Sequence, residues 1–171
     1  MIRPDTSLWA FSLSFYRHPE VERLCLQLQD QHGINVNSLL WAIWLDQICL
    51  VSDMGIWSRG LAGISHWHKM VVVPLRRVRR GISREGILGG LRKRLLSWEL
   101  MAEKRELTML EQEALKAPSV QAHNSHKTTH RFLALALEGL IDEQRQLAAL
   151  FEQWSQGDCS IFSTGEKKPL G

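Results

Sequence analysis

One segment of this chain, Leu39 to Val51, is apolar on nearly every side of the helix that its sequence favours. Asp46 and Gln47 are its only strongly polar residues, and Asn37 or Ser38 can begin the helix. A helix without a polar face must be covered by other elements, which predicts a position at the centre of a bundle. The segment is too short to cross a bilayer.

Two shorter helices are predicted before this segment. Asp5 or Thr6 can cap the first helix. Its apolar side consists of Leu8, Phe11 and Phe15. The second helix begins at Pro19, because proline fits a first helical turn, and it ends at Gly33. The apolar residues between them recur at the three- and four-residue spacing of a helix.

The middle of the chain predicts a turn followed by a basic helix. Glycines break the chain between Asp53 and Gly60, and a fourth helix is expected from Leu61 to Arg80. Pro74 removes one backbone hydrogen bond within this helix and should kink it. A break with Met70 to Val73 as a strand is the alternative, but the sequence offers no second strand to pair with it.

A hinge and two long helices are expected next. The hinge glycines are Gly81, Gly86, Gly89 and Gly90. The fifth helix ends at Pro118, residues 119 to 130 read as a polar loop, and a final helix spans about His130 to Ser155.

Both long helices carry a heptad pattern of apolar residues. The seams are Leu96, Leu100, Glu103, Leu107, Leu110, Ala114 and Ala117, and Leu133, Leu137, Leu140, Gln144, Leu147, Phe151 and Trp154. Folding about a loop near Asn124 would bring Glu103 close to Gln144 in one polar layer. The alternative is that these helices form the second half of a globular bundle.

The predicted fold class is therefore all-α: an N-terminal bundle that continues through a kinked basic helix into a long antiparallel hairpin. We expect one helical domain over 1–157, with the bundle at 5–82 and the hairpin at 87–155, and a flexible tail at 158–171. The three isolated cysteines form no disulfide framework, and no signal peptide is visible, so a cytoplasmic protein is expected.

Positive charge is concentrated between Lys69 and Arg94. This segment has nine basic residues and one acid, Glu85, for a net charge of +8, whereas the whole chain carries +3. The remainder is therefore negative. Such a local field attracts an anionic partner. The predicted contact residues are Arg76, Arg77, Arg79, Arg80, Arg84, Arg92, Lys93 and Arg94. The alternative is a solvated face with one or two arginines turned inward toward buried acids.

An aromatic pocket is the second candidate site. Asp46 stands on the apolar third helix near Trp41 and Trp44, and Trp67 could join them. A buried carboxylate must be paired or neutral. A catalytic role is possible, but a bond to Arg76 or Arg79, or to a tryptophan N–H, is the favoured interpretation.

No cofactor or designed metal site is predicted. His66 and His68 point to nearly opposite sides of a helix and cannot hold one ion. His123, His126 and His130 are spaced to lie on one helical face but lack neighbouring acids. Cys25 and Cys49 read as small core residues.

The first 110 residues resemble a known family. The matching runs are Leu8 to Phe11, Phe15-Tyr16, Pro19 to Val21, Leu26 to Gly33, Val36-Asn37, Leu40-Trp41, Trp44-Leu45, Trp67, Val72, Pro74 to Arg76 and Arg79-Arg80. The chain resembles, over roughly residues 6 to 110, an uncharacterised family of small proteobacterial proteins of unknown function. The resemblance implies a bacterial cytoplasmic protein and carries no activity, cofactor or catalytic residue.

These observations predict a non-enzymatic binding or adaptor protein. Its basic segment would dock RNA, a ribosomal or DNA backbone, or an acidic protein surface. A small enzyme with a pocket around Asp46, Trp41 and Trp44 is the alternative, and attachment to anionic lipid through the same face is a third possibility. Self-association through the C-terminal helices is also possible.

Overall fold

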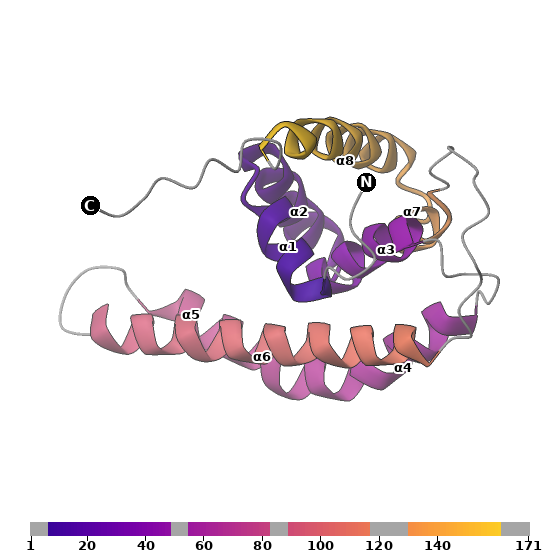
Figure 1. The fold of residues 1–171 in the computed structure, drawn as a ribbon. Coiled ribbons are helices and arrows are strands. Elements are labelled where there is room, and N and C mark those ends of the chain that lie inside the picture. The colour runs from indigo at the N-terminus through magenta and orange to yellow at the C-terminus, as the bar shows by residue number, and fades with distance from the viewer. Residues whose placement is uncertain (1–6, 49–54, 83–88, 117–129, 162–171) are drawn as a thin grey trace, which may run out of the picture.

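The computed structural model describes residues 7–48, 55–82, 89–116 and 130–161, and within these ranges the regular structure is entirely helical. The all-α fold class is confirmed. Figure 1 shows α4 to α6 at the bottom, α1 to α3 in the middle with α7 beside α3, and α8 at the top.

The first two helices lie where the sequence predicts them, but the cap of the first is Ser7 rather than Asp5 or Thr6. α1 spans Leu8–Tyr16, and Ser7 caps it by accepting a hydrogen bond from the Ala10 backbone N–H at 3.2 Å. α2 spans Pro19–His32 and ends at Gly33, whose φ of 68° is the left-handed conformation that favours glycine. The predicted bounds of α2 are confirmed.

The apolar segment forms the central helix. α3 spans Val36–Ile48, and it begins where the Asn35 side-chain oxygen accepts a hydrogen bond from the Asn37 N–H. Every residue from Leu39 to Leu45 is buried. Helices α1, α2, α6 and α7 contact α3, so the predicted central position is confirmed. The predicted end of this helix lies outside the described residues.

The fourth helix begins earlier than predicted and contains a π-helical turn. α4 spans Gly55–Trp67, so the loop predicted up to Gly60 is wrong over its last six residues. Gly60 is a packing glycine there, because it lies against the buried ring of Trp41. The π-helix η1 (His68–Val72) then joins α4 to α5 (Val73–Gly81).

Pro74 explains the position of this turn. Proline has no N–H to donate and displaces the carbonyl four residues before it. The π-turn widens the helix just before Pro74, and the Val73 N–H bonds to the His68 carbonyl. The irregularity predicted at Pro74 is therefore present as a π-turn. Of the predicted hinge glycines, Gly81 ends α5, Gly89 and Gly90 begin α6, and Gly86 lies outside the described residues.

The predicted C-terminal hairpin is wrong. α6 (Gly89–Leu115) lies alongside α4, η1 and α5, whereas α8 (Ile141–Ile161) packs on α2 from the other side of the middle layer (Figure 1). Glu103 bonds to Arg76 rather than facing Gln144. The physical reason is charge: Arg76 and Arg79 of α5 bind the acids Glu99 and Glu103 of α6, whereas Arg145 of α8 pairs with Asp142 of its own helix.

The final helix is also broken. α7 (Arg131–Ala136) ends before Gly139, whose φ of 81° is left-handed, and α8 follows. Phe151 and Trp154 of α8 pack edge-on against the α1 ring of Phe15, with centroid separations of 5.6 and 5.4 Å. α8 continues to Ile161, so residues 158–161 of the predicted tail are helical and the rest lie outside the described residues.

Candidate functional site

Two arginines of the basic segment are bound inside the protein. Arg76 donates from Nε to Glu99 at 3.1 Å and from Nη2 to Glu103 at 2.5 Å. Arg79 donates to both oxygens of Glu99. Burial favours a raised pKa for Glu99, but the hydrogen bonds from Arg79 and Arg76 hold that pKa below its usual value. Arg76 and Arg79 therefore fasten α5 to α6.

Two further arginines are partly engaged. Arg92 donates from Nη1 to the carbonyl oxygens of Arg79 and Ile82, at 2.6 and 3.0 Å. It thus binds carbonyls at the end of α5. Arg80 forms an exposed ion pair with Asp30 of α2 at 2.9 Å. Such a pair contributes little to stability and leaves Arg80 open to exchange with another anion.

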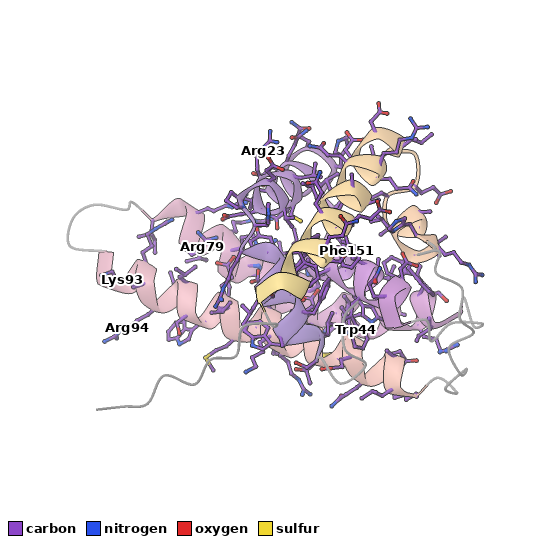
Figure 2. All side chains as sticks on the ribbon, turned by 45° about the horizontal axis from the view of Figure 1, so that its top comes forward. Arg23, Trp44, Arg79, Lys93, Arg94 and Phe151 are labelled. Atoms are coloured by element: carbon purple, nitrogen blue, oxygen red, sulfur yellow. The ribbon has the colours of Figure 1, made fainter. Side chains whose placement is uncertain are left out.

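The other predicted cations face solvent. Arg77, Lys93 and Arg94 are exposed, and none has an ion pair within the part of the chain that the structure describes. Figure 2 shows Lys93 and Arg94 at the outer end of α6, away from Arg23 on α2. Arg84 lies outside the described residues. The structure thus divides the predicted set into bound and exposed arginines.

Apolar side chains accompany these exposed cations. Trp98 is 52 % exposed and Met101 is 66 % exposed, and both follow Leu91 on one side of α6. Met70 and Val78, on η1 and α5, are exposed across a shallow groove that Leu95 also lines. Leu91 and Trp98 are spaced four and three residues from Leu95, which places them on the groove side of α6. We call this surface the outer face: Met70, Val78, Leu91, Trp98 and Met101. Exposed apolar groups gathered in one place mark interaction sites.

A cavity of about 310 Å³ lies on the opposite side of α5 and α6, between these helices and α1 to α3. Leu13, Leu26, Leu96 and Leu100 line it, with exposed fractions of 39, 39, 53 and 49 %. Its charged lining is Arg76, Arg79, Arg80, Glu22, Glu99 and Glu103. Burial raises the pKa of Glu103, although the hydrogen bond from Arg76 opposes this. We call this the interlayer cavity.

The predicted aromatic pocket is not where the sequence placed it. Trp41, Trp44 and Asp46 are buried in the core, and none of them, nor Trp67, lines the interlayer cavity. Trp67 donates its indole N–H to the Ala102 carbonyl at 3.0 Å. The tryptophans therefore serve packing at these positions.

Asp46 binds backbone rather than an arginine or an indole. Its two carboxylate oxygens accept the N–H groups of Phe132 and Leu133, each at 3.0 Å. These N–H groups belong to the first turn of α7, where intrahelical acceptors are missing. Asp46 thus caps a helix 86 residues away in sequence, and the partner predicted for it is wrong.

A third polar cluster was not predicted from the sequence. Glu106, fully buried on α6, lies 3.1 Å from Nδ1 of His68 and 2.5 Å from the amide of Asn35. The Asn35 amide donates a hydrogen bond to Glu106. The His68 contact is also a hydrogen bond when the ring hydrogen is on Nδ1. The cluster joins α6 to the π-turn and to the start of α3. One sequence feature could have indicated this cluster. Glu99 and Glu106 are spaced two helical turns apart, which places both acids on one face of α6.

The described residues form an all-helical protein with exposed cations near the start of α6 and an open cavity between its layers. The chain belongs to a family described as "Protein of unknown function (DUF2390)", which matches residues 7–110. That match includes α1 to α5 and most of α6. Comparison with curated proteins gave no match, and comparison with solved structures gave none either. Within the described ranges, no helix combines the length and apolar character needed to cross a membrane.

Proposed function

We propose that this chain is a binding protein that docks an anionic macromolecule at the outer end of α5 and α6. The observation that carries the proposal is the division within the basic segment. Arg76 and Arg79 are neutralised by acids of the protein, whereas Arg77, Lys93 and Arg94 are exposed. Exposed cations that neutralise phosphates release counterions from the nucleic acid, which favours binding.

The position of Lys93 and Arg94 supports a role other than stability. Both lie in the second turn of α6, and the first turn, where the helix dipole favours negative charge, contains no acid. The two cations therefore gain nothing from the dipole at this end of the helix. The same arrangement strengthens the local positive field that an anionic partner would meet.

Trp98 narrows the class of partner. It lies four residues after Arg94 on α6, and half of its surface is exposed. Single-stranded RNA combines phosphates with bases that stack on aromatic rings, so it suits a surface that presents both groups. We therefore favour single-stranded RNA over an acidic protein as the partner.

Fluorescence anisotropy with a labelled single-stranded RNA, a DNA duplex and poly-glutamate tests this proposal. The combined variant Arg77→Gln, Lys93→Gln and Arg94→Gln should bind the RNA at least tenfold more weakly than the parent. Affinity of the parent should fall steeply as salt rises. Trp98→Ala should weaken RNA binding and leave poly-glutamate binding unchanged.

The matched control removes the same charge elsewhere. Arg23 on α2, Lys116 just beyond the opposite end of α6 and Arg145 on α8 are exposed away from this end, and their combined replacement by glutamine lowers the net charge equally. This control should bind RNA like the parent. Equal losses in both triple variants would attribute the affinity to net charge and overturn the proposed site. Tighter binding of poly-glutamate than of RNA would assign the surface to acidic proteins.

A further inference from the structure

We propose that the interlayer cavity binds a small amphipathic carboxylate, with its apolar chain between the leucines and its carboxylate near Ser12, Asn37 and Arg76. This site is distinct from the outer end of α5 and α6, and it does not rest on the proposed RNA binding. Four observations carry it: uncovered leucines, unused polar groups, the balance of charge and the size of the cavity.

The leucines come first. Leu13 of α1 and Leu26 of α2 line one side of the cavity, and Leu96 and Leu100 of α6 line the other. Each is between 39 and 53 % exposed, whereas the leucines of the core are almost fully covered. Burying apolar surface stabilises a complex. An apolar chain between the two walls would cover leucines from three helices at once.

The polar groups give the second observation. Ser12 is only 4 % exposed, and its Oγ atom has no hydrogen-bond partner in the described part of the chain. It lines the cavity beside Asn37, which is 7 % exposed. A buried hydroxyl without a hydrogen-bond partner has a free-energy cost in the unliganded protein. A ligand atom that accepts a hydrogen bond from Ser12 would remove this cost, and the Asn37 amide can supply a second donor.

The charges select the kind of head group. Three arginines and three glutamates line the cavity, so their formal charges cancel. Arg76 uses Nε and Nη2 for Glu99 and Glu103, and its Nη1 atom has no bond to any described residue. One anionic oxygen could accept from Nη1. A doubly charged phosphate would be repelled by the three glutamates, so a single carboxylate is the better fit.

The volume sets the length of the chain. Each water molecule occupies about 30 Å³ in the liquid, so about 310 Å³ holds roughly ten groups of that size. An eight-carbon straight-chain carboxylate has about that number of heavy atoms. Octanoate is therefore the probe of choice, with octanol as the analogue without charge and butyrate as the analogue without the apolar chain.

Isothermal titration calorimetry of the full chain with octanoate tests the site. The double variant Leu26→Asn and Leu100→Asn should bind octanoate at least tenfold more weakly, because both walls become polar. Both residues are partly exposed, so the fold should tolerate the change. The matched control, Leu91→Asn and Met101→Asn on the outer face, should bind like the parent. Octanol and butyrate should each bind at least tenfold more weakly than octanoate.

Ser12→Ala separates ligand recognition from a purely structural role. Removing an unsatisfied buried hydroxyl should raise the melting temperature of the free protein while it weakens octanoate binding. The RNA-site variant Arg77→Gln, Lys93→Gln and Arg94→Gln should bind octanoate normally, so failure of one proposal leaves the other standing. No heat of binding at millimolar octanoate, or equal affinity in the wall variant and its control, would overturn the cavity site.

Discussion

Arg76 on α5 donates a hydrogen bond to Glu103 on α6, with 2.5 Å between Nη2 and Oε1. Its Nε atom is at the same time bonded to Glu99. The guanidinium therefore holds two acidic side chains of the neighbouring helix. The Glu99 side chain is 6 % exposed and the Glu103 side chain is 24 % exposed. This contact connects the basic segment to the long helix that bounds the interlayer cavity.

Arg76→Gln should lower the free energy of unfolding by about 1–3 kcal/mol, because Glu103 loses its cation and Glu99 keeps only Arg79. Arg77→Gln is the control, since Arg77 is the next residue and is exposed. That change should stay within about 0.5 kcal/mol of the parent. Urea unfolding followed by circular dichroism measures both. A similar stability for the two variants would mean that the Arg76 contacts do not hold α5 on α6.

Two glycines of α4 should respond in opposite ways to alanine. A Cβ atom at Gly60 would overlap the ring of Trp41, which is buried and stacked on Trp57. Gly60→Ala should therefore destabilise the protein by about 1–3 kcal/mol through overpacking. Gly63 has open space around its Cα, so Gly63→Ala should stabilise the helix by about 0.5–1 kcal/mol. Thermal unfolding of both variants checks the sign of each effect; a stabilised Gly60→Ala protein would contradict the close packing.

The Asp46 carboxyl should make stability depend on pH. Burial raises its pKa from 3.8 to about 6, against the hydrogen bonds from Phe132 and Leu133. Between pH 4 and pH 6 the folded protein therefore binds more protons here than the unfolded chain does. The contribution of Asp46 to the free energy of unfolding falls as pH rises through this window, by about 3 kcal/mol in total, and is constant above it.

Asp46→Asn isolates this contribution, because asparagine does not titrate. The difference in unfolding free energy between parent and variant should shrink, or change sign, as pH rises from 4 to 7. Other carboxylates titrate in both proteins, so their effects cancel in the difference. Urea unfolding at several pH values gives the curve. A difference that grows with pH would show that the folded carboxyl is more acidic than the unfolded one.

The first three helices could be predicted because their signals are local. Pro19 and Gly33 mark the two ends of α2, and the run from Leu39 to Leu45 could only be a central helix. Periodicity acts within a few residues of chain, and the described structure keeps it, although the caps differ from those predicted: Ser7 caps α1, and Asn35 precedes α3. The start of α4 was missed for a non-local reason: Gly60 reads as a helix breaker until Trp41 is seen against it.

The partner of α6 could not be read from its leucines. The heptad spacing of Leu96 and Leu100 fits any apolar neighbour, and both residues line the cavity instead of a helix pair. The acids were more informative. Glu99 and Glu103 lie one turn apart, and Arg76 and Arg79 are spaced to meet them. The complementary charges therefore indicate the partner of α6, and the heptad pattern does not.

The candidate sites were predicted in part. The basic segment contains both paired arginines and exposed cations. Which residue belongs to which group depends on the face of α5 that meets α6, and the sequence alone does not give that face. The interlayer cavity brings together Leu13, Leu26 and Leu100 from helices far apart in the chain. No local pattern marks it. Ser12 likewise looks like an ordinary helical serine until its buried, unpartnered hydroxyl is located.

Leucines on α6 provide the last test, because the two arrangements of the C-terminal helices assign them different environments. In a hairpin with the final helix, Leu100 and Leu110 would both lie in the seam. In the structure Leu110 is fully buried and Leu100 is half exposed. Leu110→Ala should therefore cost about 2–5 kcal/mol, whereas Leu100→Ala should cost less than about 1 kcal/mol.

Urea unfolding of the two leucine variants measures the difference. Both substitutions remove the same atoms from the same helix, so helix propensity changes equally and only burial differs. Phe151→Ala is a third variant, and it should lower the free energy of unfolding by about 3–5 kcal/mol. The Phe151 ring of α8 packs on Phe11 and Phe15 of α1. Equal losses of unfolding free energy at Leu100 and Leu110 would support the hairpin instead. In a helix pair both leucines would be buried, and neither would line a cavity.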